Sequence, residues 1–246
     1  MADFSIWLPL GVALIALVYS LVGHGGASGY LALLALSTLL PRDVAITALL
    51  INLVVASTSF VLYKLAHHFS WRLAWPFLVG SVPLAFVGSR LHLTEPAYYW
   101  LVGGVLLLSG VRLFWIPQTS APAETPPLPG VGVRVGTGAG IGLLSGMVGV
   151  GGGIFLSPVL LLARWATAKQ TSAVSAIFIV ANSVAGLAGR LQQGGIIHPQ
   201  TLWLVAAGFA GALAGSYVGA FAIGQRALQR ALAGVLVFAA LKLMFR

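Results

Sequence analysis

The chain alternates between long apolar stretches and short polar breaks along almost its whole length. The apolar stretches cover residues 5–22, 27–40, 45–63, 73–91, 97–115, 133–148, 153–163, 171–190, 200–222 and 228–245. About 20 apolar residues cross the ~30 Å hydrocarbon core of a bilayer as a helix. In lipid every backbone polar group must be satisfied internally, which favours helices for such stretches. The pattern therefore predicts an all-α polytopic membrane protein.

Two glycine clusters interrupt this pattern at matching places in the two halves of the chain. The clusters read Gly23-His24-Gly25-Gly26-Ala27-Ser28-Gly29 and Gly149-Val150-Gly151-Gly152-Gly153. Backbone that leaves the helix at membrane depth is tolerated only where it is buried in protein or lines a polar cavity. Paired interruptions in corresponding segments point to the binding site of a transporter. We therefore interpret the clusters as functional helix breaks.

The length of the first apolar region decides how its break is used. Residues 7–40 as one helix would be about 50 Å long at 1.5 Å per residue, against ~30 Å of hydrocarbon. Two short helices folded back at the glycines fit this thickness. Each half then holds a broken, re-entrant helical hairpin plus three transmembrane helices. Since three full spans are an odd number, the halves would enter the membrane in opposite orientations, as inverted repeats.

A Pro-rich polar segment separates the two halves, because closely spaced prolines cannot lie inside a helix. We divide the chain into a first repeat at 1–115, a linker at 116–132 and a second repeat at 133–246. Asn52 and Asn182 each lie eight residues after the valine that opens their stretch, Val44 and Val174. The same offset aligns the last helices of the two halves, which supports an internal duplication.

Composition agrees with the membrane assignment. Hydrophobic residues make up 59% of the chain and charged residues 7%, whereas soluble domains carry about 25% charged residues. The 13 Lys and Arg against 4 Asp and Glu give a net charge of +9. These basic residues are scattered at the ends of apolar stretches, which is typical of headgroup anchors and not of a nucleic-acid surface. The hairpin topology gathers most of them on one side, and the positive-inside rule then places both termini outside the cytoplasm.

The helix breaks provide the candidate chemistry. The second short helix of each hairpin would begin near Ser28 and near Ile154, and helix N-termini expose unpaired N–H groups with partial positive charge. Glycine allows close backbone approach there, so two converging breaks predict an anion site. The expected substrate-binding residues are Gly23, His24, Gly25, Gly26, Ser28, Asn52, Gly149, Gly151, Gly152, Gly153 and Asn182.

Several of these residues admit more than one interpretation. An ionisable residue inside a membrane is usually functional, so His24 could bind the anion or carry a proton, but it could also be a neutral structural histidine. Asn52 and Asn182 could line the cavity or join helices. Arg190 could attract anions at a vestibule, but an anchor at the membrane interface is the favoured interpretation.

Other glycines at four-residue spacing predict close helix packing. They are Gly132, Gly136 and Gly140; Gly138, Gly142 and Gly146; and Gly211, Gly215 and Gly219.

Missing residue types narrow the function classes. The four acidic residues are expected in termini or loops, which argues against a proton relay through buried carboxylates; they are Asp3, Asp43, Glu95 and Glu124. The chain has no cysteine and offers no metal-ligand cluster, nucleophile–base pair or ATP-binding loop. We therefore expect neither an enzyme nor a cofactor or metal site.

The motif Gly149-x-Gly151-Gly152-Gly153 followed by Pro158, with the repeated apolar segments, resembles the TauE/SafE sulfite exporter family. The segment 145–158 is the most specific part. The first cluster departs from the pattern, since it contains His24 and lacks a proline matching Pro158.

The resemblance implies a permease of the bacterial inner membrane. Its expected partners are the lipid bilayer and a small inorganic or organic sulfur anion such as sulfite or a sulfonate, bound between the breaks and moved by alternating access. A passive anion channel and a substrate-free membrane scaffold are the alternatives. A homodimer is left open.

Overall fold

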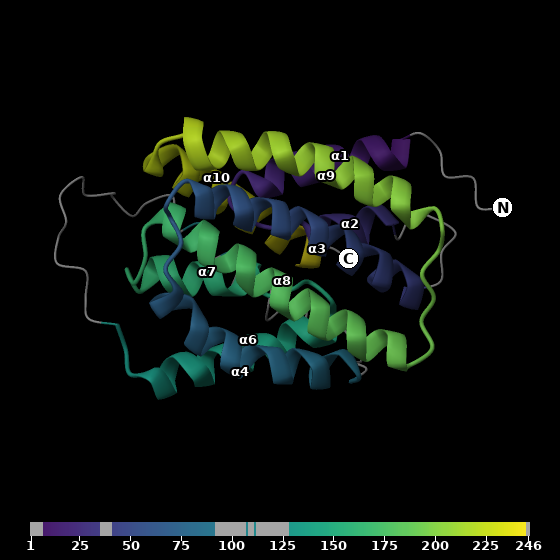
Figure 1. Cartoon of the computed structure of the whole chain (residues 1–246), viewed down its shortest axis with the longest axis horizontal. Helices are drawn as coiled ribbons and strands as arrows, with labels where there is room; N and C mark the ends of the chain where they lie inside the picture. Colours follow the sequence, from purple (N-terminus) through teal and green to yellow (C-terminus); the bar gives the residue numbers. More distant parts are fainter. Residues whose placement is uncertain (1–6, 35–40, 92–106, 108–110, 112–127, 245–246) are drawn as a thin grey trace.

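The computed structural model describes residues 7–34, 41–91, 107, 111 and 128–244 (Figure 1). Its helices are α1 (Trp7–Ser20), α2 (Ala27–Leu34), α3 (Pro41–Leu65), α4 (Trp71–Ser89), α6 (Val131–Val148), α7 (Gly153–Leu162), α8 (Ala168–Gln192), α9 (Thr201–Tyr217), the π-helical turn η1 (Val218–Ala222) and α10 (Gln225–Met244). The described residues contain no strand, so the all-α prediction is confirmed. The span expected at 97–115 and most of the Pro-rich linker lie outside the described residues.

Five described helices are long and apolar enough to cross a membrane. They cover Asp43–Leu65, Trp71–Ser89, Val131–Val148, Ala168–Gln192 and Thr201–Ala222. α1 and α7 are shorter apolar helices. α6, which we expected to be a half-length arm of a hairpin, has 18 residues and so belongs to the longer group. The protein is a multi-pass membrane protein.

Both glycine clusters end a helix, as predicted. α1 ends at Ser20 and α2 begins at Ala27, whereas α6 ends at Val148 and α7 begins at Gly153. Five glycines of the clusters have a left-handed backbone: Gly23, Gly26, Gly149, Gly151 and Gly152. An L-side chain is strained in that conformation, which explains why glycine is needed at these positions. We call residues 21–26 the first glycine turn and residues 149–152 the second.

The first glycine turn folds α2 back along α1. Gly29 on α2 lies against Ile15 on α1, and the Tyr19 and Ser28 hydroxyls are hydrogen-bonded at 3.1 Å. Further from the glycine turn, Gly11 on α1 lies against Leu33 on α2. A Cβ atom added at Gly11 would be 2.8 Å from the Leu33 side chain. These contacts run in antiparallel order, so α1 and α2 form the expected hairpin.

Eight of the described helices pack into two bundles, which do not coincide with the two halves of the sequence (Figure 1). α10 packs on a third core that it shares with residues of α1, α3, α7 and α8. The first bundle contains α1, α2, α3 and α9, and its core is formed by Val12, Ala16, Tyr30, Leu34, Val44, Ala48, Ile51, Val55, Leu204 and Ala212. The second bundle contains α4, α6, α7 and α8, with a core of Leu73, Ala74, Phe77, Ile141, Leu156, Leu160, Ala166, Val174 and Phe178. α3 and α8 pack against each other and form the seam between the bundles. α4 of the first half therefore lies in the second bundle, and α9 of the second half lies in the first bundle. We call this the exchange of α4 and α9.

Glycines let the outer helices of each bundle touch backbone to backbone. On α6, Gly138, Gly142 and Gly146 lie against carbonyl groups of α4; on α9, Gly211 and Gly215 lie against carbonyl groups of α1, and Gly219 in η1 lies against the Leu21 carbonyl just after α1. The packing role expected for these six glycines is confirmed. For Gly132, Gly136 and Gly140 it stays a prediction, because no described atom lies within 4 Å of an added Cβ. They point away from α4, since two residues along a helix turn the side chain about 200°.

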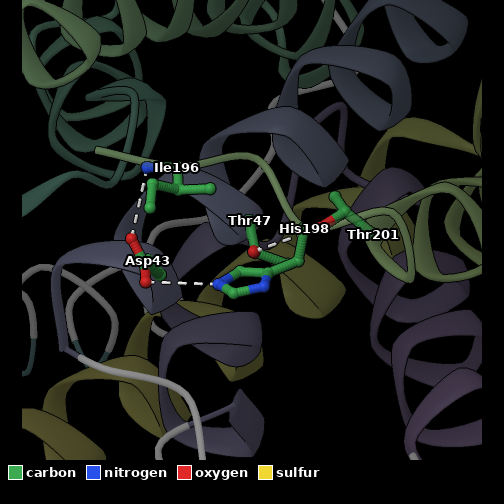
Figure 2. A network of polar contacts seen from close by, with 5 residues as sticks. All are labelled: Asp43, Thr47, Ile196, His198 and Thr201. Carbon is green, nitrogen blue, oxygen red and sulfur yellow. Dashed lines mark hydrogen bonds and ion pairs between the residues drawn. The ribbon is translucent and has the colours of Figure 1, made fainter. Parts of the chain in front are cut away.

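A polar network attaches the α8–α9 loop to the start of α3 (Figure 2). Asp43 Oδ1 accepts a 3.3 Å hydrogen bond from the Ile196 amide, and Asp43 Oδ2 lies 3.2 Å from His198 Nε2. Next to it the Thr47 and Thr201 hydroxyls are 3.4 Å apart. Asp43 is 2% exposed in the first turn of α3, so its expected place in a loop is wrong. A helix N-terminus favours a carboxylate, and the histidine partner allows it to be buried.

Candidate functional site

The two glycine turns are buried and meet at the seam between the bundles. In the first turn, Gly23 lies against the Ser172 backbone of α8, and Gly25 lies against the Asn52 side chain of α3. In the second turn, Gly151 approaches the same asparagine, because an added Cβ would lie 2.7 Å from Asn52 Nδ2. Residues from both breaks are therefore brought together at Asn52.

The Asn52 amide links both turns and both bundles. Its Oδ1 accepts a 3.1 Å hydrogen bond from the Ala27 amide, the first residue of α2. Its Nδ2 donates a 2.8 Å hydrogen bond to the Ser183 hydroxyl on α8. The residue is fully buried at 0% exposure. Asn52 thus occupies the N-terminus of α2 with an acceptor oxygen and presents its amide nitrogen to the second turn.

Asn182 on α8 holds the second turn in a corresponding way. Its Nδ2 donates a 3.3 Å hydrogen bond to the Gly151 carbonyl, and its Oδ1 accepts from the Ser81 hydroxyl of α4 at 2.5 Å. Each asparagine therefore bonds to the backbone at the helix break of its own half of the sequence. The bonds differ in direction, because Asn52 accepts from the Ala27 amide and Asn182 donates to the Gly151 carbonyl.

His24 is almost completely buried, at 2% exposure, and bridges the bundles. Its Nδ1 lies 3.0 Å from the Val22 carbonyl oxygen, and its Nε2 lies 3.2 Å from the Ser157 hydroxyl on α7. A carbonyl oxygen can only accept, so in the neutral ring Nδ1 carries the proton and Nε2 accepts from Ser157. The Ser157 hydroxyl is also hydrogen-bonded to the Ser175 hydroxyl of α8 at 2.8 Å.

Arg190 contacts the C-terminus of α6, and its favoured role as an anchor at the membrane interface stays a prediction. One guanidinium nitrogen donates to the Gly146 and Met147 carbonyls at 3.0 and 3.1 Å. An added Cβ at Gly149 would lie 3.2 Å from the same nitrogen. A cation is favoured at a helix C-terminus, where carbonyl groups lack intrahelical partners. Arg190 therefore caps α6 and adds a positive charge beside the second glycine turn.

The remaining expected residues lie against side chains of their own bundle. Ser28 is directed to Tyr19 on α1, as its hydrogen bond shows, and Gly26 lies against the Tyr30 ring. Gly152 lies against Ser145 and Phe178 inside the second bundle. Gly153 begins α7 and lies against Ile179. They shape the turns, whereas Asn52, His24, Gly25 and Gly151 form the junction between them.

Sequence reasoning missed three hydroxyls that complete this junction: Ser81, Ser157 and Ser183. Ser157 lies one helical turn after Gly153 and so faces the same side as the second glycine turn, and Ser183 directly follows Asn182. These spacings could have singled them out. Ser81 carries no such signal, because it reaches Asn182 from another helix.

The helix-end amides are already engaged within the protein. Asn52 accepts from the Ala27 amide, and the Gly152 carbonyl accepts from the Phe155 and Leu156 amides at 3.0 and 3.1 Å. A ligand at the junction would therefore take the place of an acceptor that the protein supplies itself.

Comparisons with known proteins identify the family. The model of the Sulfite exporter TauE/SafE family matches residues 8–243. The protein named "Probable membrane transporter protein y4hK", from Sinorhizobium fredii (strain NBRC 101917 / NGR234), is 33% identical over 243 residues, which are 98% of each chain. No solved structure matches. The chain belongs to the sulfite exporter TauE/SafE family.

Proposed function

We propose that the protein is a secondary transporter that carries a small sulfur anion, such as sulfite, a related oxyanion or an organosulfonate, across the bacterial inner membrane. Family membership and the transporter-named relative support transport as the general function. The choice of an anion rests on the junction of the glycine turns, and the sulfur chemistry rests on the family.

The observation that carries the proposal is the position of Asn52. Its Oδ1 lies at the N-terminus of α2, where an acceptor atom is favoured by the Ala27 amide, which donates to it, and by the positive end of the helix dipole. An oxygen of a bound oxyanion would occupy the same kind of position. The Asn52 and Asn182 amides and the Ser183 hydroxyl supply further donors within the seam.

Charge around the junction also favours a negative ligand. Among the described residues, Asp43 is the only carboxylate, and it is engaged with His198 and Ile196 at the start of α3. Arg190 lies beside the second turn. An anion at the junction would therefore meet dipoles and a guanidinium without a nearby negative charge.

Alternating access would use the α3–α8 seam. Each bundle has its own apolar core, and a third core joins Tyr19 and Tyr63 to Ile154, Leu161 and α10. The junction adds polar contacts between the bundles, through Asn52–Ser183 and His24–Ser157. Parting of the bundles on one side and then on the other would expose the junction in turn. The moving units would be the two bundles and not the two halves of the sequence, because α4 lies in the second bundle and α9 in the first.

An inverted duplication fits the packing. Exchanging the halves maps the α1–α9 contact onto α6–α4, and the α4–α8 contact onto α9–α3, and all four contacts are present. We propose that the two halves are inverted repeats, with both termini outside the cytoplasm.

The test is transport in proteoliposomes with labelled sulfite, thiosulfate and a sulfonate. A transporter shows saturation and trans-stimulated counterflow, whereas a passive channel shows no trans-stimulation and a scaffold moves none of the anions. Asn52→Ala should abolish counterflow. Thr137→Ala is the control, since Thr137 bonds only to the Val133 carbonyl of its own helix; its counterflow should match the unaltered protein. Unchanged counterflow in Asn52→Ala would refute the proposed site.

A further inference from the structure

We propose that His24 binds a proton that is transported together with the anion, so that the two cross the membrane as a neutral pair. The inference rests on the proposed function, and it names a second ligand of the same junction. It is carried by the burial of His24, by its hydrogen bonds to Val22 and Ser157, and by the contact that these bonds make between the bundles.

The first step is the charge balance of the buried seam. An isolated ion removed from water is strongly destabilised unless an opposite charge accompanies it. His24 has no carboxylate among its described hydrogen-bond partners, so an imidazolium alone would be unfavourable there. The Arg190 guanidinium beside the second turn is already engaged with the Gly146 and Met147 carbonyls, so it does not by itself balance an anion at Asn52. Each ion stabilises the other, and by linkage each raises the affinity for the other equally.

The second step is the exchange of hydrogen bonds at Ser157. In the neutral ring Nε2 accepts the Ser157 hydroxyl proton, since Nδ1–H is directed to the Val22 carbonyl. When a proton adds to Nε2, the new N–H must donate to Ser157 Oγ. The Ser157 proton then turns away and becomes a donor for another acceptor at the seam. Protonation therefore converts Ser157 from a donor to His24 into a donor for the anion.

The third step is the route by which a proton reaches the His24 side chain, which is buried away from water. Ser175 is hydrogen-bonded to Ser157 at 2.8 Å and extends the hydroxyl row along α8. One turn earlier on the same face is Thr171, a fully buried residue whose hydroxyl has no hydrogen-bond partner among the described residues. The hydrogen-bonded row is His24, Ser157 and Ser175, and the unbonded Thr171 hydroxyl lies one turn nearer the N-terminus of α8. A proton can move along the bonded row by successive donation and acceptance, and Thr171 would extend the row by turning its hydroxyl toward Ser175.

No other described group near His24 is suited to this proton. The buried titratable side chains of α1, α2 and α3 are the phenols Tyr19, Tyr30 and Tyr63 and the carboxylate Asp43, which is engaged with Ile196 and His198. Tyr19 is bonded to Ser28, and Tyr63 donates to the Leu21 carbonyl. On α8, Lys169 donates to the Ala220 carbonyl and Arg190 to α6. His24 is therefore the group that would change charge at the seam.

The experiment measures proton and anion movement together in proteoliposomes of the full chain. Methanesulfonate is the probe, because it stays ionised across the pH range used and cannot itself deliver a proton. An internal pH dye records acidification, and potassium with valinomycin sets the membrane potential. We expect methanesulfonate uptake to acidify the interior, to respond less than twofold to the potential, and to reach about tenfold accumulation per unit of pH gradient, since one unit equals a tenfold ratio.

His24→Gln keeps hydrogen-bonding capacity but cannot become an imidazolium. Its remaining uptake should cause no acidification and should follow the membrane potential. His67→Asn is the matched control: His67 is exposed and has a left-handed backbone at φ 59°, which asparagine tolerates. It should keep both acidification and accumulation. The melting temperature of each variant, measured in detergent, shows whether it is folded.

The possible failures are distinguishable. If the unaltered protein takes up methanesulfonate without acidification and in response to the potential, the proton site is overturned and the transporter remains. If folded His24→Gln still acidifies with uptake, the assignment to His24 is overturned. If neither methanesulfonate, sulfite nor thiosulfate exchanges under any gradient, the proposed function fails, and the proton site fails with it.

Discussion

Asn52 on α3 donates a 2.8 Å hydrogen bond to Ser183 on α8, and this bond crosses the seam between the two bundles. Hydrogen bonds between membrane helices contribute about 0.6 kcal/mol on average and up to about 1.7 kcal/mol. A contact of that strength can hold the bundles in register and still break during each transport cycle. The apolar core inside each bundle need not be disrupted, whereas the core shared with α10 also joins the two bundles.

The Asn52–Ser183 bond should appear as an energetic coupling. In a double-mutant cycle of Asn52→Ala and Ser183→Ala, we expect a coupling of about 0.5–1.7 kcal/mol. Asn52→Ala alone should lower the free energy of unfolding by about 1–3 kcal/mol, because the buried Ala27 amide also loses its acceptor. Reversible unfolding in mixed detergent micelles measures both values. Additive effects would show that the bond contributes nothing across the seam.

The second glycine turn should not tolerate a side chain. Gly151→Ala places a Cβ within 2.7 Å of Asn52 Nδ2 on a backbone with φ 72°, so we expect a loss of about 1–3 kcal/mol in stability and of most transport. Gly140→Ala is the control, because its Cβ meets no described atom within 4 Å. It should be neutral or stabilising by up to about 1 kcal/mol. Equal effects of both substitutions in thermal unfolding would contradict the assignment of the turn.

Arg190 should affect substrate affinity more than folding. Arg190→Ala removes the donors to the Gly146 and Met147 carbonyls and a positive charge beside Gly149. We expect the KM for the anion to rise about tenfold or more, with Arg190→Lys intermediate, because lysine keeps the charge but not the planar geometry. Concentration-dependent uptake gives KM and maximal rate separately. A fall in maximal rate alone, with KM unchanged, would assign Arg190 to the cap of α6 only.

His68, in the α3–α4 loop, should make stability depend on pH. Burial lowers the pKa of His68, and the neighbouring Lys169 charge lowers it further. The unfolded chain therefore binds the proton at higher pH than the folded protein, and the contribution of neutral His68 to stability is lost as the pH falls below its usual pKa of about 6.5. Melting temperatures between pH 8 and pH 5 should decrease, and His68→Gln should reduce the decrease. An unchanged slope in that variant would exclude His68 as the cause.

The helix breaks were predictable from the sequence because they are local properties. Contiguous glycines stop a helix wherever they occur, and Gly23 and Gly151 do so here with left-handed backbones. The correspondence between Asn52 and Asn182 was also visible, because each lies eight residues after the valine that opens its apolar stretch. Both patterns can be recognised in the sequence because each depends only on the spacing of residues along the chain.

The partners across the seam could not be predicted in the same way. An apolar helix carries little information about which other helix it contacts, so the exchange of α4 and α9 was not foreseen. The two glycine rows of α6 have the same spacing, and only the position of α4 shows that Gly138 is packed and Gly136 is not. The contact of Arg190 with the C-terminus of α6 also depends on where that helix lies, which the sequence does not show.

The exchange of α4 and α9 has a consequence for how the chain is made. Neither half can complete a bundle by itself, since residues 1–115 provide three helices of the first bundle without its fourth, and residues 133–246 provide three of the second. The glycine contacts of α6 with α4 and of α9 with α1 join the halves through their backbones. Fragments produced separately would therefore have to interlock in the membrane before either is stable, and a chain cut within 116–132 would stay together.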